Sequence, residues 1–294
     1  MENGKLPPDL DALISLLDDP DKEAFHHVSE KISSLGPIAV PSLEDAWLLS
    51  FDPVMQERIE DLVHRIQFEN LRVELRQWKE SGASDLIRGY YLVSRFQFPD
   101  LGEEILRKQL EKIRRDIWLE LNEKLTPLEK VKVLNHILFA VEDFSPIPTG
   151  PYSPERFYLN CLLESRAGTP LSLGLLYLIL AQELKLPLQG VDLPRHFILA
   201  FTNRNADVRF SGQDSLEIQF YVNPFANGVA FTRKELNLYL RHLGLDPEEK
   251  YYLPCSNLQV IRRLLDELRT AYTEDGNDEK VNEINILRES LEEE

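Results

Sequence analysis

The most restrictive feature of the sequence is an apolar run from Leu171 to Leu184. Apolar side chains occur on most faces of a helix built from this run, so other parts of the chain have to cover it on most sides. Thr169 is a good N-cap, because its hydroxyl can accept a hydrogen bond from a free backbone N–H of the first turn. Pro170 suits the first helical position, where a missing N–H costs nothing. The run therefore predicts a buried central helix.

Short segments with the length and composition of strands follow this helix. The predicted strands are residues 189–193, 196–201, 206–210 and 215–222, with a turn at 203–205. Polar and apolar residues alternate in the last of them, as expected for an antiparallel sheet with one solvated face. A buried helix beside such a sheet predicts an α+β core.

A helix N-terminus that faces a strand carrying a histidine is a possible catalytic layout. The helix end supplies positive potential and free N–H groups, and His196 could serve as a general base. The layout also needs a nucleophile at the start of the helix. The residues there are Gly168, Thr169, Pro170, Leu171 and Ser172, and neither cysteine is among them.

Several blocks of sequence, taken in order, resemble the SirB-type branch of the transglutaminase-like superfamily. The blocks are Leu159-Asn160, Leu163, Arg166, Gly168-x-Pro170-Leu171-Ser172-Leu173, Gly190-Val191, Pro194-x-His196-Phe197 and Val222-Asn223-Pro224-Phe225 followed by Gly228. The resemblance also extends upstream, through Phe98 to Leu101 and Leu134 to Phe139. Each block alone is weak, whereas their common order is fairly specific.

The resemblance implies a papain-like α+β core in which active members use a Cys at a helix start, a His on a strand and an Asp on the next strand. By position, His196 matches the His and Asn223 matches the Asp, while the Cys position falls at Pro170 or Ser172. An Asn can still orient a catalytic His. A Ser hydroxyl, unlike a thiolate, needs a strong base beside it. We therefore predict a catalytically silent site in which His196, Asn223 and Ser172 are vestigial.

The resemblance also implies a cleft around these residues, bordered by the loop at 143–154. The predicted lining residues are Asn160, Gly168, Thr169, Pro170, Pro194, Phe197, Pro224 and Phe225. Structural interpretations compete with the functional ones. A lone His on a strand is more often structural than catalytic, Ser172 can satisfy N–H groups of the first helical turn, and Asn223 either caps the strand end or holds the His ring.

Composition excludes several classes of function. The net charge is −17, so the basic footprint of a nucleic-acid-binding protein is missing. The two cysteines, Cys161 and Cys255, are far apart, and no histidine has ligand spacing with them, so we expect no metal site and no cofactor. So few cysteines favour a reducing, cytoplasmic location. We find no signal segment and no run long enough to cross a membrane.

The first part of the chain, 8–79, shows four apolar stripes at helical spacing. Asp19-Pro20, Gly36-Pro37 and Asp52-Pro53 separate them. This pattern resembles roughly two HEAT-type units, whose free face is commonly a docking surface. The alternative is a helical cap on the core. Helices are also predicted at 85–96, 102–124 and 127–141.

Three regions follow from these patterns: a HEAT-like region 1–82, a transglutaminase-like core 83–230 and a helical region 231–294. The last region begins with a capping box at Thr232 and Glu235. It ends with two helices around Gly276-Asn277 that resemble one tetratricopeptide-like unit, and one such unit has to pack on the core. The sequence does not fix the oligomeric state.

Two hypotheses of function remain. The favoured one is a non-catalytic scaffold that binds a protein partner through its N-terminal helices. The alternative is a cysteine- or serine-type amide hydrolase or acyltransferase, with His196 as base, Asn223 as the residue that orients it, and Ser172 or Cys161 as nucleophile. It requires a hydroxyl or thiol within about 4 Å of the His ring.

Overall fold

The computed structural model describes residues 9–194, 196–203, 217–242 and 244–292. The chain divides into two compact units, Met1–Gln77 and Trp78–Glu294. The predicted strand at 206–210 and most of the turn before it lie outside the described residues. The predicted core, 83–230, and the predicted C-terminal region, 231–294, both belong to the second unit.

The first unit is helical. Its elements are α1 (Leu10–Ser15), η1 (Leu16–Asp18), α2 (Lys22–Leu35), η2 (Gly36–Ala39), α3 (Val40–Leu49) and α4 (Pro53–Glu80), which continues to the start of the second unit. Helix α2 lies between two of the predicted breaks: Asp21, which follows Asp19-Pro20, caps it, and Gly36 ends it with a φ of 68° that suits glycine. The apolar stripes meet in one core that includes Leu17, Ile32 and Leu43. The HEAT-type interpretation stays a prediction.

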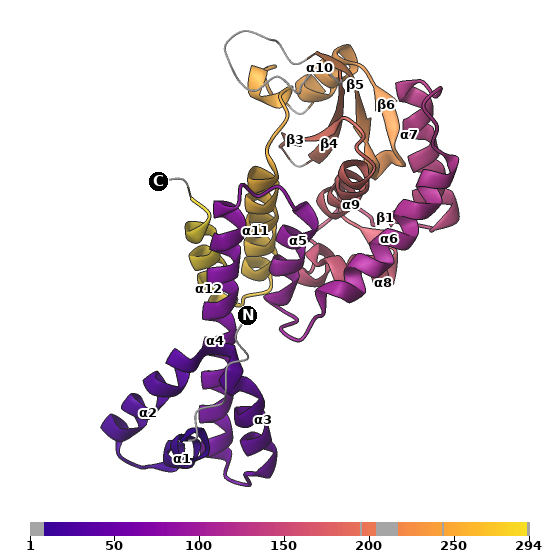
Figure 1. Cartoon of the computed structure of the whole chain (residues 1–294). Coiled ribbons are helices and arrows are strands. Elements are labelled where there is room, and N and C mark those ends of the chain that lie inside the picture. The colour runs from indigo at the N-terminus through magenta and orange to yellow at the C-terminus, as the bar shows by residue number, and fades with distance from the viewer. Residues whose placement is uncertain (1–8, 195, 204–216, 243, 293–294) are drawn as a thin grey trace. The chain divides into compact units, whose positions relative to one another are not determined.

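A four-stranded antiparallel sheet lies in the second unit (Figure 1). Its strands are β3 (Leu188–Leu193), β4 (His196–Thr202), β5 (Ile218–Asn223) and β6 (Val229–Phe231), in the order β3-β4-β5-β6. The α+β class and the described predicted strands are confirmed, with slightly different ends. Strand β6 was not predicted, since three residues after a turn carry no alternation that a sequence pattern can detect.

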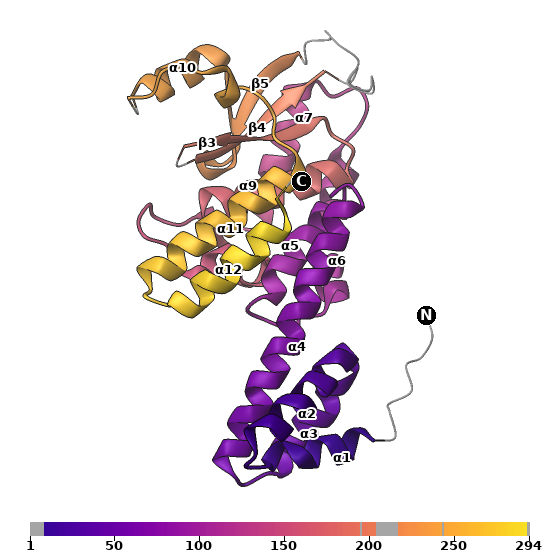
Figure 2. The ribbon, with the colours of Figure 1, turned by 90° about the vertical axis from the view of Figure 1, so that its left-hand side faces the viewer.

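Helices cover both faces of this sheet. Helix α9 (Pro170–Glu183) packs on β3 and β4, and nearly all of its residues are buried, as the apolar run predicted. Helix α10 (Arg233–His242) lies on the other face, where Leu236 and Leu240 join a core with Val191 and Ile198 of the sheet. Figures 1 and 2 show the sheet between the two helices. The predicted capping box of Thr232 and Glu235 precedes α10.

The remaining helices of the second unit are α5 (Leu86–Arg95), α6 (Glu103–Glu120), α7 (Pro127–Asn135) with a π-helical continuation η3 (His136–Val141), α8 (Leu159–Ser165), α11 (Asn257–Glu274) and α12 (Asp278–Ser290). Of these helices, α6 and α8 pack on α9. Short elements complete the unit: a parallel pair, β1 (Ser145–Pro146) and β2 (Ala167–Gly168), and single turns η4 (Pro154–Phe157), η6 (Pro224–Ala226) and η7 (Glu249–Tyr251). Helices α11 and α12 lie side by side, and α11 also packs on α5 (Figure 2). Within the described residues, no helix combines the length and the apolar character that a membrane span requires.

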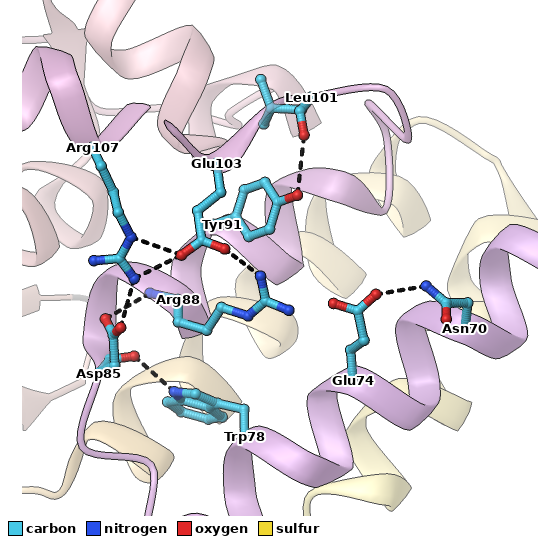
Figure 3. Close-up of polar contacts among 9 residues, drawn as sticks. All are labelled: Asn70, Glu74, Trp78, Asp85, Arg88, Tyr91, Leu101, Glu103 and Arg107. Carbon is cyan, nitrogen blue, oxygen red and sulfur yellow. Dashed lines mark hydrogen bonds and ion pairs between the residues drawn. The ribbon is translucent and has the colours of Figure 1, made fainter. Parts of the chain in front are cut away.

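A polar cluster joins the starts of α5 and α6 (Figure 3). Asp85 caps α5 by accepting from the N–H of Arg88, and its other oxygen lies 2.5 Å from the guanidinium of Arg107. Glu103 bridges the side chains of Arg88 and Arg107. Because these groups are only half-buried, the cluster mainly fixes the geometry of the two helix starts and adds little to stability.

Candidate functional site

A cleft of about 880 Å³ opens in the second unit. Five parts of the chain line it: the loop 149–152 with Phe157, the start of α9, the start of β4, Tyr239 of α10 and one side of α11. The cleft therefore lies where the N-terminus of α9 meets the strand that carries His196.

The start of α9 is closed by a reciprocal cap. The side chain of Thr169 accepts from the N–H of Ser172 at 3.1 Å, and the Ser172 hydroxyl accepts from the N–H of Thr169 at 2.8 Å. Both side chains are buried, and Ser172 is not among the residues that line the cleft. The N-cap predicted at Thr169 is confirmed. The Ser172 hydroxyl faces its own helix turn, which matches the structural interpretation of this residue.

His196 is the first residue of β4 and lines the cleft. Its ring packs against the rings of Tyr239 and Phe225, with centroids 5.4 Å and 6.0 Å away. Its Nδ1 atom is buried and has no hydrogen-bond partner among the described residues. Burial lowers the pKa of His196 below its usual value. The imidazole is therefore neutral at neutral pH, with no described group that orients it.

Asn223 ends β5 and uses its side chain locally. Its Oδ1 accepts from the N–H of Phe225 at 3.1 Å, so it caps the turn η6 that follows. No hydrogen bond joins Asn223 to the His196 ring among the described residues. Of the two alternatives that the sequence left open, the structure has the cap at the strand end.

Neither cysteine has the environment of a nucleophile. Burial, followed by the charges of Glu155 and Glu164, raises the pKa of Cys161. Burial also raises the pKa of Cys255 to about 12, and its thiol donates to the carbonyl oxygen of Gly190 at 3.2 Å. Reactive cysteines have lowered pKa values, since the thiolate is the attacking form. Both side chains are therefore thiols at neutral pH.

The predicted cleft residues fall into two groups. Thr169, Pro170 and Phe197 line the cleft together with His196. Asn160, Gly168, Pro194, Pro224 and Phe225 are not among the lining residues. Members of this second group support the walls: Phe225 packs on the His196 ring, and Gly168 lies against the side chains of Leu162 and Leu173.

Phe197 is held between two glycines, and this explains why glycine occurs at both positions. A Cβ atom at Gly174 of α9 would lie 2.4 Å from the Phe197 ring, and one at Gly190 of β3 would lie 2.6 Å from it. The ring is buried and joins the central helix to the sheet beneath the cleft.

The residues of α11 that line the cleft were not predicted from the sequence. Arg263, Glu267, Thr270 and Glu274 line the cleft at a spacing that puts them on one side of the helix. This polar stripe was visible in the sequence, opposite the buried stripe of Val260, Leu264 and Leu268. A pattern within one helix does not reveal that its polar side lines a cleft with residues from distant parts of the chain.

The geometry can be set beside known proteins. A family model described as the transglutaminase-like superfamily matches residues 104–266, more than half of the chain. A UPF0162 protein of Xylella fastidiosa (strain 9a5c) is 28% identical over 188 residues, which are 62% of this chain and 62% of that protein. A UPF0162 protein of Buchnera aphidicola subsp. Schizaphis graminum is 29% identical over 160 residues, 53% of this chain and 54% of that protein.

F-box only protein 21 of Mus musculus is 27% identical over 158 residues, which are 54% of this chain and 24% of that protein. The chain thus matches less than two thirds of the length of each of these relatives. No solved structure matches it. The matched region 104–266 contains α9, β3, β4 and β5, and with them His196, Asn223 and Ser172. By this match, the chain belongs to the transglutaminase-like superfamily.

Proposed function

We propose that this protein is a non-catalytic transglutaminase-like module that binds another protein. One observation carries the proposal: the only hydroxyl offered by sequence for the nucleophile position, that of Ser172, is buried and bonded to Thr169 in the cap of α9. A Ser nucleophile needs a base within hydrogen-bond reach. The described hydrogen bonds of Ser172 all stay within its own helix turn.

The surroundings of His196 support the same proposal. Its pKa is lowered by burial, and no described carboxylate or amide bonds to its Nδ1 atom, so it would be a weak base without the partner that stabilises its protonated form. The raised pKa values of Cys161 and Cys255 leave no thiolate to replace the missing nucleophile. A cleft with these properties is suited to holding a segment of a protein chain and not to cleaving it.

The purified chain is expected to catalyse neither amide hydrolysis nor acyl transfer. It is incubated with a fluorophosphonate probe, with iodoacetamide at neutral pH, and with a glutamine-containing protein plus a biotinylated amine. We expect no labelling of Ser172 by the probe and no deamidation, cleavage or amine transfer, as followed by mass spectrometry. Replacing His196 with Gln or Ser172 with Ala should leave this background unchanged. Turnover that is lost in H196Q or S172A would overturn the proposal and restore the hydrolase or acyltransferase alternative.

We also propose that the protein partner docks on the N-terminal helices. Leu48, Leu49, Phe51 and Val54, here called the α3–α4 patch, are 69%, 79%, 98% and 52% exposed. Large apolar side chains gathered in this way are typical of interaction sites. Exposed carboxylates flank the patch at Glu44, Asp45, Asp52 and Glu57, with no basic residue from 40 to 57. A partner with an apolar pocket and a basic rim fits such a surface.

Changing Phe51→Asp should abolish recovery of the partner from cells, because Phe51 is the most exposed residue of the patch and aromatic side chains are the kind that anchor an interface. The tagged wild-type chain and the variant are purified side by side and the bound proteins are quantified. Leu119→Asp is the matched control, since Leu119 is 68% exposed on α6 of the other unit. Equal recovery with F51D and wild type, or equal loss with L119D, would contradict docking at this patch.

The proposal also covers the family branch, the type of the helical regions and the location of the protein. We assign the chain to the SirB-type branch on its sequence blocks, with HEAT-like N-terminal helices and a tetratricopeptide-like pair formed by α11 and α12. A cytoplasmic location is proposed from the sparse use of cysteine.

A further inference from the structure

The walls of the cleft differ in chemistry. Aromatic residues contribute to the lining at Tyr152, Phe157, Phe197 and Tyr239. The polar stripe of α11 contributes Arg263, Glu267, Thr270 and Glu274. An occupant of this cleft therefore has to satisfy apolar ring faces and fixed charges at the same time.

The α11 wall is negative although it contains an arginine. Arg263 lies 2.7 Å from the carboxylate of Asp192 and 2.6 Å from that of Glu267, so two carboxylates share one guanidinium. Glu274 adds a further carboxylate, and its side chain is exposed. His196, which also lines the cleft, is neutral at neutral pH and does not offset this charge. The balance favours a cationic ligand.

The C-terminal end of α11 strengthens this preference. The helix ends at Glu274, its C-cap is Asp275, and its last turn holds no basic residue. The last carbonyl groups of a helix carry a partial negative charge, which attracts cations within about one turn. Charge and helix dipole thus act in the same direction at one end of the cleft.

Aromatic rings lie beside these carboxylates. The rings of Tyr152 and Phe157 meet edge to face with centroids 6.1 Å apart. Burial raises the pKa of Tyr152, and the charge of Glu267 raises it further, which agrees with a hydroxyl close to that carboxylate. A planar guanidinium can stack on such a ring and donate to a carboxylate at the same time, whereas an ammonium group is a compact, strongly hydrated charge.

The size of the cleft indicates what carries the cation. Ligand pockets of about 300–1,000 Å³ bury most of a drug-sized molecule, and this cleft has about 880 Å³. That is far more than one guanidinium fills. Several residues of a chain fit, with an apolar side chain against Pro170 and Tyr239.

We propose that the cleft binds an arginine-bearing segment of another protein, with the guanidinium between Tyr152 and the carboxylates of Glu267 and Glu274. This inference rests on the proposed function, in which the cleft binds without turnover, and it names the class of segment bound. The occupant is separate from the partner proposed for the α3–α4 patch.

The test uses the full chain and a capped peptide, acetyl-Ala-Leu-Arg-Leu-Ala-amide, titrated by calorimetry at pH 7. Three further peptides carry lysine, citrulline or glutamate in place of the arginine. Citrulline keeps the shape of the side chain without its charge. We expect the arginine peptide to bind about fivefold to tenfold more tightly than the citrulline peptide, with lysine between them and glutamate weakest.

Variants of the cleft locate the effect. Glu274→Gln should weaken the arginine peptide about threefold and leave the citrulline peptide unchanged, since one partly exposed ion pair is lost. Glu279→Gln is the matched control, because Glu279 is an exposed acid on α12 outside the cleft lining. Tyr152→Leu should reduce the arginine preference without any change in charge.

Equal binding of the arginine and citrulline peptides, or equal weakening by E274Q and E279Q, would overturn the inference. No binding of any peptide at millimolar concentration would also overturn it, while a chain without turnover would still support the proposed function. The proposed function can also fail while the inference holds. Cleavage or covalent modification of the bound peptide, detected by mass spectrometry, would contradict the proposed function without contradicting the preference for arginine.

Discussion

Replacing Phe197 with Ala is expected to lower the free energy of unfolding of the Trp78–Glu294 unit by about 3–5 kcal/mol. The ring is 2% exposed and lies between the backbone of α9 at Gly174 and that of β3 at Gly190. Cavity formation adds to the loss of buried apolar area when the surroundings cannot collapse. Two glycines have no side chains that could move into the space, so we expect a value at the upper end of this range.

The decrease in the free energy of unfolding is measured by urea denaturation of the full chain in a Trp47→Phe background. Trp118 and Trp78, both in the second unit, then provide the signal, since Trp47 is the tryptophan of the first unit. Phe197→Leu fills part of the space and should cost about 1–2 kcal/mol. A loss below about 1 kcal/mol for Phe197→Ala would show that the ring does not join the helix to the sheet in the way we describe.

Phe197 also shows which parts of the fold the sequence could predict. The buried helix, its cap at Thr169 and Pro170, and the strands on either side of Pro194 depend on residues near one another in the chain. Local hydrogen bonding and apolar patterns determine such elements, so the sequence was sufficient for them. Of the two glycines that hold the ring, Gly190 was noted as part of a sequence block and Gly174 was not singled out, because the reason for both is a contact between α9, β3 and β4.

The candidate site was predictable only in part for the same reason. His196 was predicted because it begins a strand that follows the buried helix and because it matches the family's His by position. Its neighbours in space, Tyr239 and the α11 residues Arg263 and Glu267, come from helices that the sequence assigned to a separate region. The sequence predicted that the C-terminal helix pair packs on the core, but no local pattern states that the polar side of α11 lines the cleft. The charge of the cleft, on which our proposed ligand depends, could therefore be recognised only from the tertiary structure.

Replacing Gly228 with Ala is expected to cost about 2–4 kcal/mol, the second large effect. Gly228 precedes β6 with a φ of 71°, which is costly for any residue with a Cβ. A Cβ atom there would lie 1.7 Å from Oδ1 of Asn135. That side chain cannot simply turn away, because Asn135 donates to the Gly228 carbonyl oxygen at 2.8 Å and accepts from the hydroxyl of buried Tyr177 at 3.0 Å.

A matched control separates backbone strain from the lost contacts. Gly276 has nearly the same φ, 74°, and a Cβ atom there would meet no other atom within 4 Å, so Gly276→Ala should cost only about 1 kcal/mol. The excess in Gly228→Ala then measures the Asn135 contacts, and it should shrink in the background Asn135→Ala, where the two changes are not additive. Equal losses for the two glycines in urea denaturation would mean that strain alone acts at Gly228. A larger loss at Gly228 would show that Asn135 fastens the β5–β6 connection to α7 and α9, on the side of the sheet that carries the central helix.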